Sequence, residues 1–151
     1  MEYRNGLKII GISIETTNEN GKSMKDLGLL WDKFYRENIS NKISGKVSNL
    51  IYSIYTDYES DYTGKYTTII GMEVDSLDDL PEGMIGREFE GGKFVKFTTS
   101  GELPDAIGRT WQKIWANDQE LNRRYTADYE IHDPSVLGGD EAKVDIYIAV
   151  R

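Results

Sequence analysis

The stretch 126–135, TADYEIHDPS, holds the chemistry-bearing side chains that stand closest together in this chain. It contains the only histidine, His132, together with the carboxylates Asp128, Glu130 and Asp133. Side chains alternate across a β-strand, so Asp128, Glu130 and His132 would share one face. Three interpretations are open: a polar face turned to water, an acid–base cluster, or one buried carboxylate that awaits a positively charged ligand.

The sequence gives little support for a nucleophilic catalytic triad or for a metal site. A Ser-His-Asp arrangement needs a carboxylate that orients the histidine, but Asp133 would point to the strand face opposite His132, and no G-x-S-x-G occurs. We therefore expect His132 to be a partly exposed bystander at the strand end. One histidine and no cysteine make a transition-metal site improbable. The acidic run 57–61 resembles a calcium loop, but Tyr62 stands where glycine is required. Phosphate-binding glycine loops are absent from the sequence.

A carboxylate among aromatic side chains suits an organic cation. The chain has ten tyrosines and three tryptophans, and a cation over such a ring gains about 0.5–2 kcal/mol. Two alternatives stay open: the aromatics fill half-buried sheet positions, or the face that carries Glu130 is solvated, which is the ordinary expectation for an arbitrary strand. The net charge of −8 and the lack of a basic cluster argue against direct nucleic-acid binding.

The elements that would position these residues occur twice. GLLWDKFY (28–35) aligns with GRTWQKIW (108–115), and Asp57-Tyr58-Glu59 precedes a similar Asp128-Tyr129-Glu130. These matches in the same order predict a duplicated unit, with pseudo-repeats at about 1–75 and 85–151. On these grounds alone Glu59 has the same standing as Glu130.

Each unit has the pattern β-α-β-β. In both units a helix follows the first strand; Ser23 is the expected N-cap of one, and Pro104 suits the first turn of the other. A charged segment at 75–83 links the units, an extra short strand is compatible with 85–89, and a loop is expected at 133–142. This order predicts the α+β class: an antiparallel or mixed sheet, two principal helices and a ligand groove at the pseudo-two-fold junction. The expected strands are 8–14, 50–58, 66–74, 93–99, 126–132 and 143–150.

Length and composition indicate a single domain over residues 1–151. The chain has no cysteine, no apolar run long enough for a membrane helix, and no signal-peptide pattern, so we expect a cytoplasmic protein.

Three motifs give the chain a family resemblance. YTDYESDYTGKYTTIIGMEV (55–74), WQKIW (111–115) and ADYEIHDP (127–134) together resemble the GyrI-like effector-binding family, the ligand-sensing module of AraC-type and MerR-type transcription regulators. The match covers essentially the whole chain and is strongest for stand-alone members, including those carried on integron cassettes. Because those regulators carry a DNA-binding segment before the module and this chain begins with its first strand, the resemblance implies sensing or sequestering a ligand without reading a promoter directly.

The resemblance also implies site residues. Family members bind amphipathic, often cationic, drug-like molecules around a central glutamate, and Glu130 is the position that matches it. Trp111 and the tyrosines Tyr55 and Tyr58 lie in the matching motifs, whereas Tyr66 and Tyr147 are expectations from neighbouring strands.

The expected function is therefore small-molecule binding without cofactor or metal, possible regulation through a partner protein, and no membrane or nucleic-acid contact. Two alternatives remain open: a hydrolase of small toxic molecules with Glu130 as general base, and an inhibitory protein–protein module. The residues do not identify the ligand, and they leave the oligomeric state open.

Overall fold

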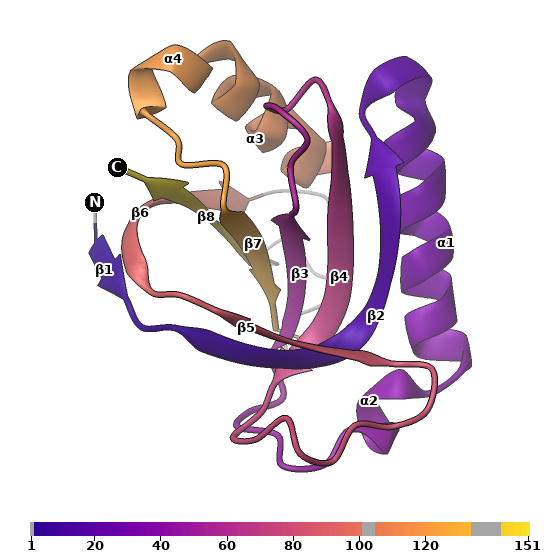
Figure 1. The fold of residues 1–151 in the computed structure, drawn as a ribbon. Helices are drawn as coiled ribbons and strands as arrows, with labels where there is room; N and C mark the ends of the chain where they lie inside the picture. The colour runs from indigo at the N-terminus through magenta and orange to yellow at the C-terminus, as the bar shows by residue number, and fades with distance from the viewer. Residues whose placement is uncertain (1, 101–104, 134–142) are drawn as a thin grey trace.

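The computed structural model describes residues 2–100, 105–133 and 143–151, and these residues form an α+β fold around one curled antiparallel sheet (Figure 1). The helices of the described part are α1 (Lys22–Arg36), α2 (Ile39–Lys42), α3 (Asp105–Ala116) and α4 (Asp118–Leu121), with a 3-10 turn η1 (Glu19–Gly21) before α1. Its strands are β1 (Glu2–Arg4), β2 (Leu7–Thr17), β3 (Ile51–Thr56), β4 (Lys65–Glu73), β5 (Ile85–Phe89), β6 (Gly92–Ser100), β7 (Ala127–His132) and β8 (Lys143–Val150).

The strand order is pseudo-symmetric about its central pair, β3 and β7. The sheet runs β1-β6-β8-β7-β3-β4-β2-β5, and β3 pairs with β7 so that Ser53 stands opposite Glu130. Outward from this pair, β3-β4-β2 corresponds to β7-β8-β6. The edge strands are exchanged, because β5 pairs with β2 while β1 pairs with β6. A duplicated βαββ unit would produce this order, and we propose duplication as its origin.

The two long helices pack on the same face of the sheet and leave its centre free. Leu30 and Phe34 of α1 pack on isoleucines of β2 and β4, and Ile114 of α3 packs on Ile146 and Ile148 of β8. In Figure 1, α1 runs alongside β2 at the right and α3 lies at the top. Burial of such side chains is the main stabilisation of both helices. The central strands β3 and β7 therefore carry their polar residues between the helices.

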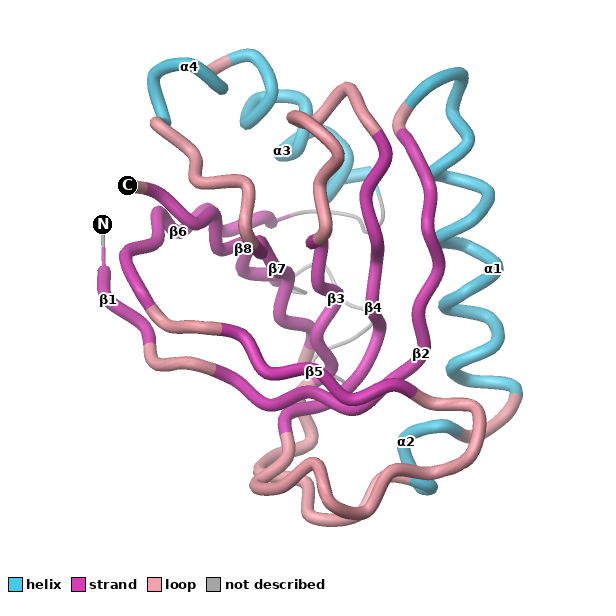
Figure 2. Tube along the Cα trace, in the orientation of Figure 1, coloured by secondary structure: helices cyan, strands magenta, loops and turns pink. Residues whose placement is uncertain are grey.

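The opposite face of the sheet encloses a second core as the sheet curls. Its largest members are tyrosine and phenylalanine rings: Tyr52, Phe89, Phe94, Tyr129 and Tyr147. Figure 2 traces the bend, where β2 and β5 run together across the lower part of the view.

A pair of facing glycines lies within the β2–β4 pairing. Gly11 stands opposite Gly71, and a Cβ on Gly11 would lie 2.2 Å from the carbonyl oxygen of Ile70. Only glycine fits so close a backbone approach.

The predicted strands all exist, with ends that differ by no more than three residues, and the short strand at 85–89 is β5. Ser23 was wrong as an N-cap: α1 begins at Lys22 after Gly21, whose φ of 71° suits glycine. Asp26 accepts hydrogen bonds from Thr16 Oγ1 and Lys22 Nζ, both at 2.7 Å. The sequence reading missed β1, α2 and α4. Its expectations for Pro104 and for 134–142 lie outside the described residues.

Candidate functional site

A cavity of about 960 Å³ lies above the central strands, between the two long helices. Its floor comes from β3, β4 and β7, and its walls come from α1, α3 and the turn between β3 and β4. Most of the large side chains that line it are aromatic: Trp31, Tyr35, Tyr55, Tyr58, Tyr62, Tyr66, Trp111 and Trp115. The charged or titratable side chains Arg109, Arg123, Glu130 and His132 also contribute. The cavity is thus an aromatic chamber of the size that encloses drug-like molecules.

Glu130 lies at the floor of this cavity, 3% exposed, and both of its carboxylate oxygens are engaged. Oε2 accepts hydrogen bonds from the Tyr55 hydroxyl and the Trp111 indole nitrogen, each at 2.7 Å. Oε1 lies 2.8 Å from His132 Nε2. The donors therefore come from β3, α3 and β7, so the carboxylate joins the sheet centre to α3.

These contacts keep Glu130 ionised despite its burial. Burial alone would raise the pKa of the carboxyl group, but the hydrogen bond and charge of His132 and the donors Tyr55 and Trp111 bring the pKa below its usual value. For Tyr55, burial and the adjacent Glu130 charge raise the pKa well above 10. At neutral pH the pair is thus a carboxylate and a neutral hydroxyl donor.

His132 is part of this cluster, so the expectation of a partly exposed bystander was wrong. The residue is 9% exposed, and its ring centroid lies 4.8 Å from that of Trp31 on α1. The alternative in which the polar face of this strand is solvated is also wrong. Asp128, Glu130 and His132 do share one face, but that face is the one between α1 and α3, and all three residues are buried.

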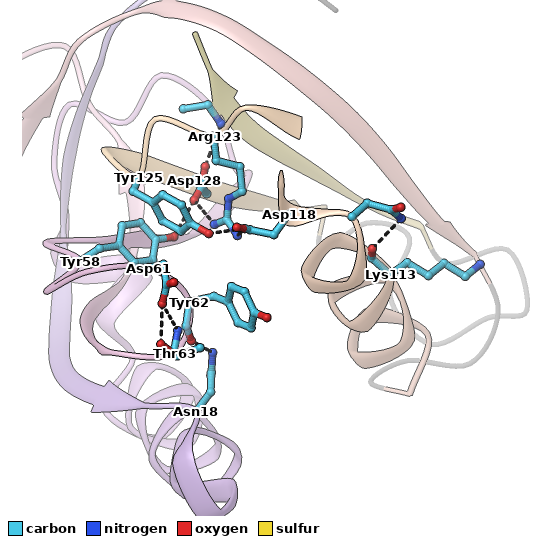
Figure 3. Close-up of polar contacts among 12 residues, drawn as sticks. Asn18, Tyr58, Asp61, Tyr62, Thr63, Lys113, Asp118, Arg123, Tyr125 and Asp128 are labelled. Atoms are coloured by element: carbon cyan, nitrogen blue, oxygen red, sulfur yellow. Dashed lines mark hydrogen bonds and ion pairs between the residues drawn. The ribbon is translucent and has the colours of Figure 1, made fainter. Parts of the chain in front are cut away.

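Asp128 belongs to a separate network that the sequence did not reveal (Figure 3). Its Oδ2 lies 2.7 Å from Arg123 Nη2 and accepts a hydrogen bond from the Tyr58 hydroxyl at 2.6 Å, while Oδ1 accepts one from the Ala149 amide at 2.8 Å. Arg123 also reaches Asp118 at 3.1 Å. The Arg123 charge is thus held by two aspartates, and among the described side chains no lysine or arginine forms an ion pair with Glu130.

Five of the six predicted ligand-binding residues, Glu130, Trp111, Tyr55, Tyr58 and Tyr66, line the cavity.

Tyr147 is the exception. The register of β7 and β8 pairs it with Tyr129, which points to the opposite face of the sheet. There its ring packs against Tyr129 with a centroid separation of 5.4 Å and lies 4.0 Å below the Arg4 guanidinium. Because Tyr147 lies on the sheet face opposite the cavity, the expectation that it lines the pocket is wrong.

The internal repeat could have supplied two of the cavity residues that the motifs missed. In the aligned helices Trp31 corresponds to Trp111 and Tyr35 to Trp115, and all four line the cavity. Tyr62 has no such signal, because it lies in the β3–β4 turn and stacks on Trp115 at 5.7 Å only once the chain folds.

Comparison with known proteins decides the family. Residues 1–150 match the family described as integron-associated effector binding protein. The chain belongs to this family. An integron cassette protein from the mobile metagenome of Vibrio cholerae has a similar structure, with 31% identity, a TM-score of 0.74, and coverage of 99% of this chain and 94% of that one.

Two further proteins are similar to this chain, one in structure and one in sequence. A structure of SAV2435 bound to tetraphenylphosphonium matches with a TM-score of 0.81 at 18% identity, over 100% of this chain and 94% of that one. The putative transcriptional regulator YobU of Bacillus subtilis is 28% identical over 87 residues, which are 57% of this chain and 54% of that protein. The matched part of this chain thus corresponds to about half the length of YobU.

The described residues contain neither a candidate metal cluster nor a candidate membrane-spanning helix. They contain no group of three or more histidine, cysteine or carboxylate side chains placed to hold a metal ion. No helix in the described ranges is long and apolar enough to cross a membrane.

Proposed function

We propose that this effector-binding protein takes an amphipathic organic cation into the aromatic cavity, with Glu130 as its counter-ion. One observation carries the proposal: Glu130 is buried and its contacts lower the pKa of its carboxyl group, yet among the described side chains it has no lysine or arginine partner. A buried charge is stable only when it is paired or strongly hydrogen-bonded. A ligand cation would add the permanent positive charge that no lysine or arginine supplies, and the surrounding aromatic faces would add about 0.5–2 kcal/mol for each good contact.

The walls suit the apolar part of such a ligand. Tyr55 meets Trp111 edge to face at 5.1 Å, and Trp115 lies 6.5 Å from Trp111. Rigid rings of this kind contribute contact area at low cost in conformational entropy. Flat or multi-ring cations would therefore be held by stacking and by the charge of Glu130 together.

The comparisons support the same proposal. SAV2435, which shares the fold, was captured with tetraphenylphosphonium, a multi-ring cation. YobU, which is related in sequence, is described as a putative transcriptional regulator. We extend the proposal accordingly: ligand binding serves sensing, and regulation of transcription would proceed through a partner protein.

The hydrolase alternative receives less support from the geometry. A general base works best when its pKa lies near the working pH, but the contacts of Glu130 lower its pKa. Both oxygens already accept hydrogen bonds or contact His132, so an attacking water would have to compete with these side chains. A counter-ion role needs neither a raised pKa nor a displaced donor.

Two probes of equal shape and opposite charge test the proposal. Trp31, Trp111 and Trp115 are the three tryptophans of the chain, and all line the cavity, so intrinsic fluorescence reports on this site. We expect tetraphenylphosphonium to change the fluorescence saturably and tetraphenylborate to bind much more weakly. Equal affinity for the two ions, or no saturable change with the phosphonium, would contradict the proposed function.

A further inference from the structure

The contact between His132 and Glu130 has a consequence for ligand binding that goes beyond the charge of Glu130. His132 is the only histidine of the chain, and its Nε2 lies 2.8 Å from Oε1 of the pocket carboxylate. Histidine changes its charge between about pH 5 and 8, whereas carboxylates and tyrosines ordinarily do not. The charge of the cavity floor therefore depends on the protonation state of one imidazole.

The hydrogen bond itself survives this change of charge. The ionised Glu130 carboxylate has no hydrogen to donate, so the hydrogen between the two groups belongs to Nε2. A neutral imidazole with its hydrogen on Nε2 and a doubly protonated imidazolium both make this bond. The pair carries no net charge with the imidazolium and one negative charge with the neutral ring. Only the Nδ1 proton distinguishes the two states.

Two neighbours of His132 offer contacts to an imidazolium. The ring lies 4.8 Å from Trp31, within the range of a cation–π contact, and Glu130 is its charge partner. Arg123 contributes little opposing charge because Asp118 and Asp128 neutralise it. The other titratable or charged groups that line the same cavity are Tyr35 from α1, Tyr55 from β3, Tyr58 and Tyr62 from the β3–β4 turn, Tyr66 from β4 and Arg109 from α3, and Asp133 follows His132 in the chain.

A cationic ligand changes this balance. It would approach the same carboxylate that His132 already faces, so the imidazolium and the ligand would compete for one negative charge. Loss of the Nδ1 proton removes the repulsion and leaves the Nε2 hydrogen bond in place. The proton can leave through the open cavity that His132 lines.

We propose that His132 is the resident counter-ion of Glu130 and that a ligand cation replaces its positive charge, so that cation binding releases one proton. This inference rests on the proposed function, because it requires a cation in the same cavity. It makes the protein bind cations more tightly as pH rises through the histidine range. It also distinguishes this site from a fixed carboxylate pocket, whose cation affinity would be constant over that range.

The test measures tetraphenylphosphonium affinity between pH 5 and 8.5 by calorimetry, in buffers of different ionisation enthalpy. We expect the affinity to rise by up to about tenfold per pH unit while His132 is protonated in the free protein, and then to level off. The measured binding enthalpy should vary with the ionisation enthalpy of the buffer, with a slope that corresponds to the release of up to one proton. Binding that is independent of pH and releases no proton would overturn the inference and leave the proposed function intact.

The matched variant is His132→Gln, whose amide can still donate to Glu130 but carries no charge. It should bind the phosphonium with the affinity that the natural protein reaches at high pH, and with no dependence on pH. A variant with the original pH dependence would overturn the inference. If neither protein binds the phosphonium at any pH, the proposed function fails and this inference fails with it.

A second readout needs no variant. Because the chain has one histidine, its imidazole carbon-bound protons give one assigned set of NMR signals. With tetraphenylphosphonium bound, the midpoint of their pH titration should move to a lower pH than in the free protein. The ratio of the two proton dissociation constants should equal the ratio of the ligand affinities at high and low pH. An unchanged titration in the saturated complex would contradict the proton release.

Discussion

Two carboxylates on β7 stand two residues apart on the same strand face, yet they have opposite electrostatic surroundings. Asp128 is fully buried and faces Arg123 at 2.7 Å, so its charge is neutralised within the protein. Glu130 has only uncharged donors and the histidine. We therefore propose that Asp128 serves stability and that Glu130 serves ligand binding.

The Asp128–Arg123 pair leads to a prediction about stability. Removing one partner of a buried ion pair leaves the other charge uncompensated and costs about 3–5 kcal/mol. Because Arg123 retains Asp118, we expect Asp128→Asn to lower the free energy of unfolding by about 3 kcal/mol, measured by urea denaturation. The control is Asp32→Asn, which breaks an exposed pair with Arg36 and should cost no more than about 0.5 kcal/mol. Equal losses in the two variants would refute the assignment.

At the scale of elements, the site depends on two helices that flank the central strands and leave room between them. Gly28 in α1 and Gly108 in α3 are aligned in the two similar helix sequences, and both line the cavity. A Cβ at either position would meet no atom within 4 Å. The glycines are thus dispensable for helix packing, and their effect is to keep the space between the helices open.

Glycines of the helices and of the sheet should respond in opposite ways to alanine. Gly28→Ala should raise the free energy of unfolding by up to about 1 kcal/mol, because glycine is a poor helix former and the added methyl group meets no neighbour. Gly11→Ala should lower it by at least about 1–3 kcal/mol, since its Cβ would overlap the backbone of β4. Urea denaturation of both variants checks the pair. A stabilised Gly11→Ala protein would contradict the close backbone approach.

At the scale of the whole molecule, the buried tyrosines set a limit to stability in alkali. Burial and the Asp128 charge raise the pKa of Tyr58 well above 10, and burial raises the pKa of Tyr52 and of Tyr66 to about 12. An unfolded tyrosine ionises near pH 10. A raised folded-state pKa means that this stabilisation is complete below pH 10 and is lost as pH rises toward 12.

We therefore expect the free energy of unfolding to fall steeply between about pH 10 and 12. Absorbance at 295 nm should show the exposed tyrosines ionising first and the buried ones only together with loss of secondary structure. Ionisation of every tyrosine near pH 10 in a protein that stays folded would contradict their burial.

Much of this arrangement could be predicted from the sequence. Alternation and β-branched runs indicated the strands, and the repeat indicated the helices and the junction between the halves. The burial of Asp128 and His132 could not be predicted, because a strand pattern does not tell which face the helices cover. The exchange of the edge strands β1 and β5 also has no local signal, since it is set by pairing between the two halves. Tyr147 was misplaced for a related reason: its face depends on the β7–β8 register.

The central claim is that the negative charge of Glu130 holds the ligand, and one affinity measurement tests it directly. Tetraphenylphosphonium should bind Glu130→Gln at least about tenfold more weakly than the natural protein, because the amide preserves the size of the side chain but removes its charge. The control Glu59→Gln changes the exposed glutamate that the sequence similarity aligns with Glu130, in the turn between β3 and β4, and should leave the affinity unchanged. A folded Glu130→Gln protein that binds the phosphonium as tightly as the natural one would contradict the account.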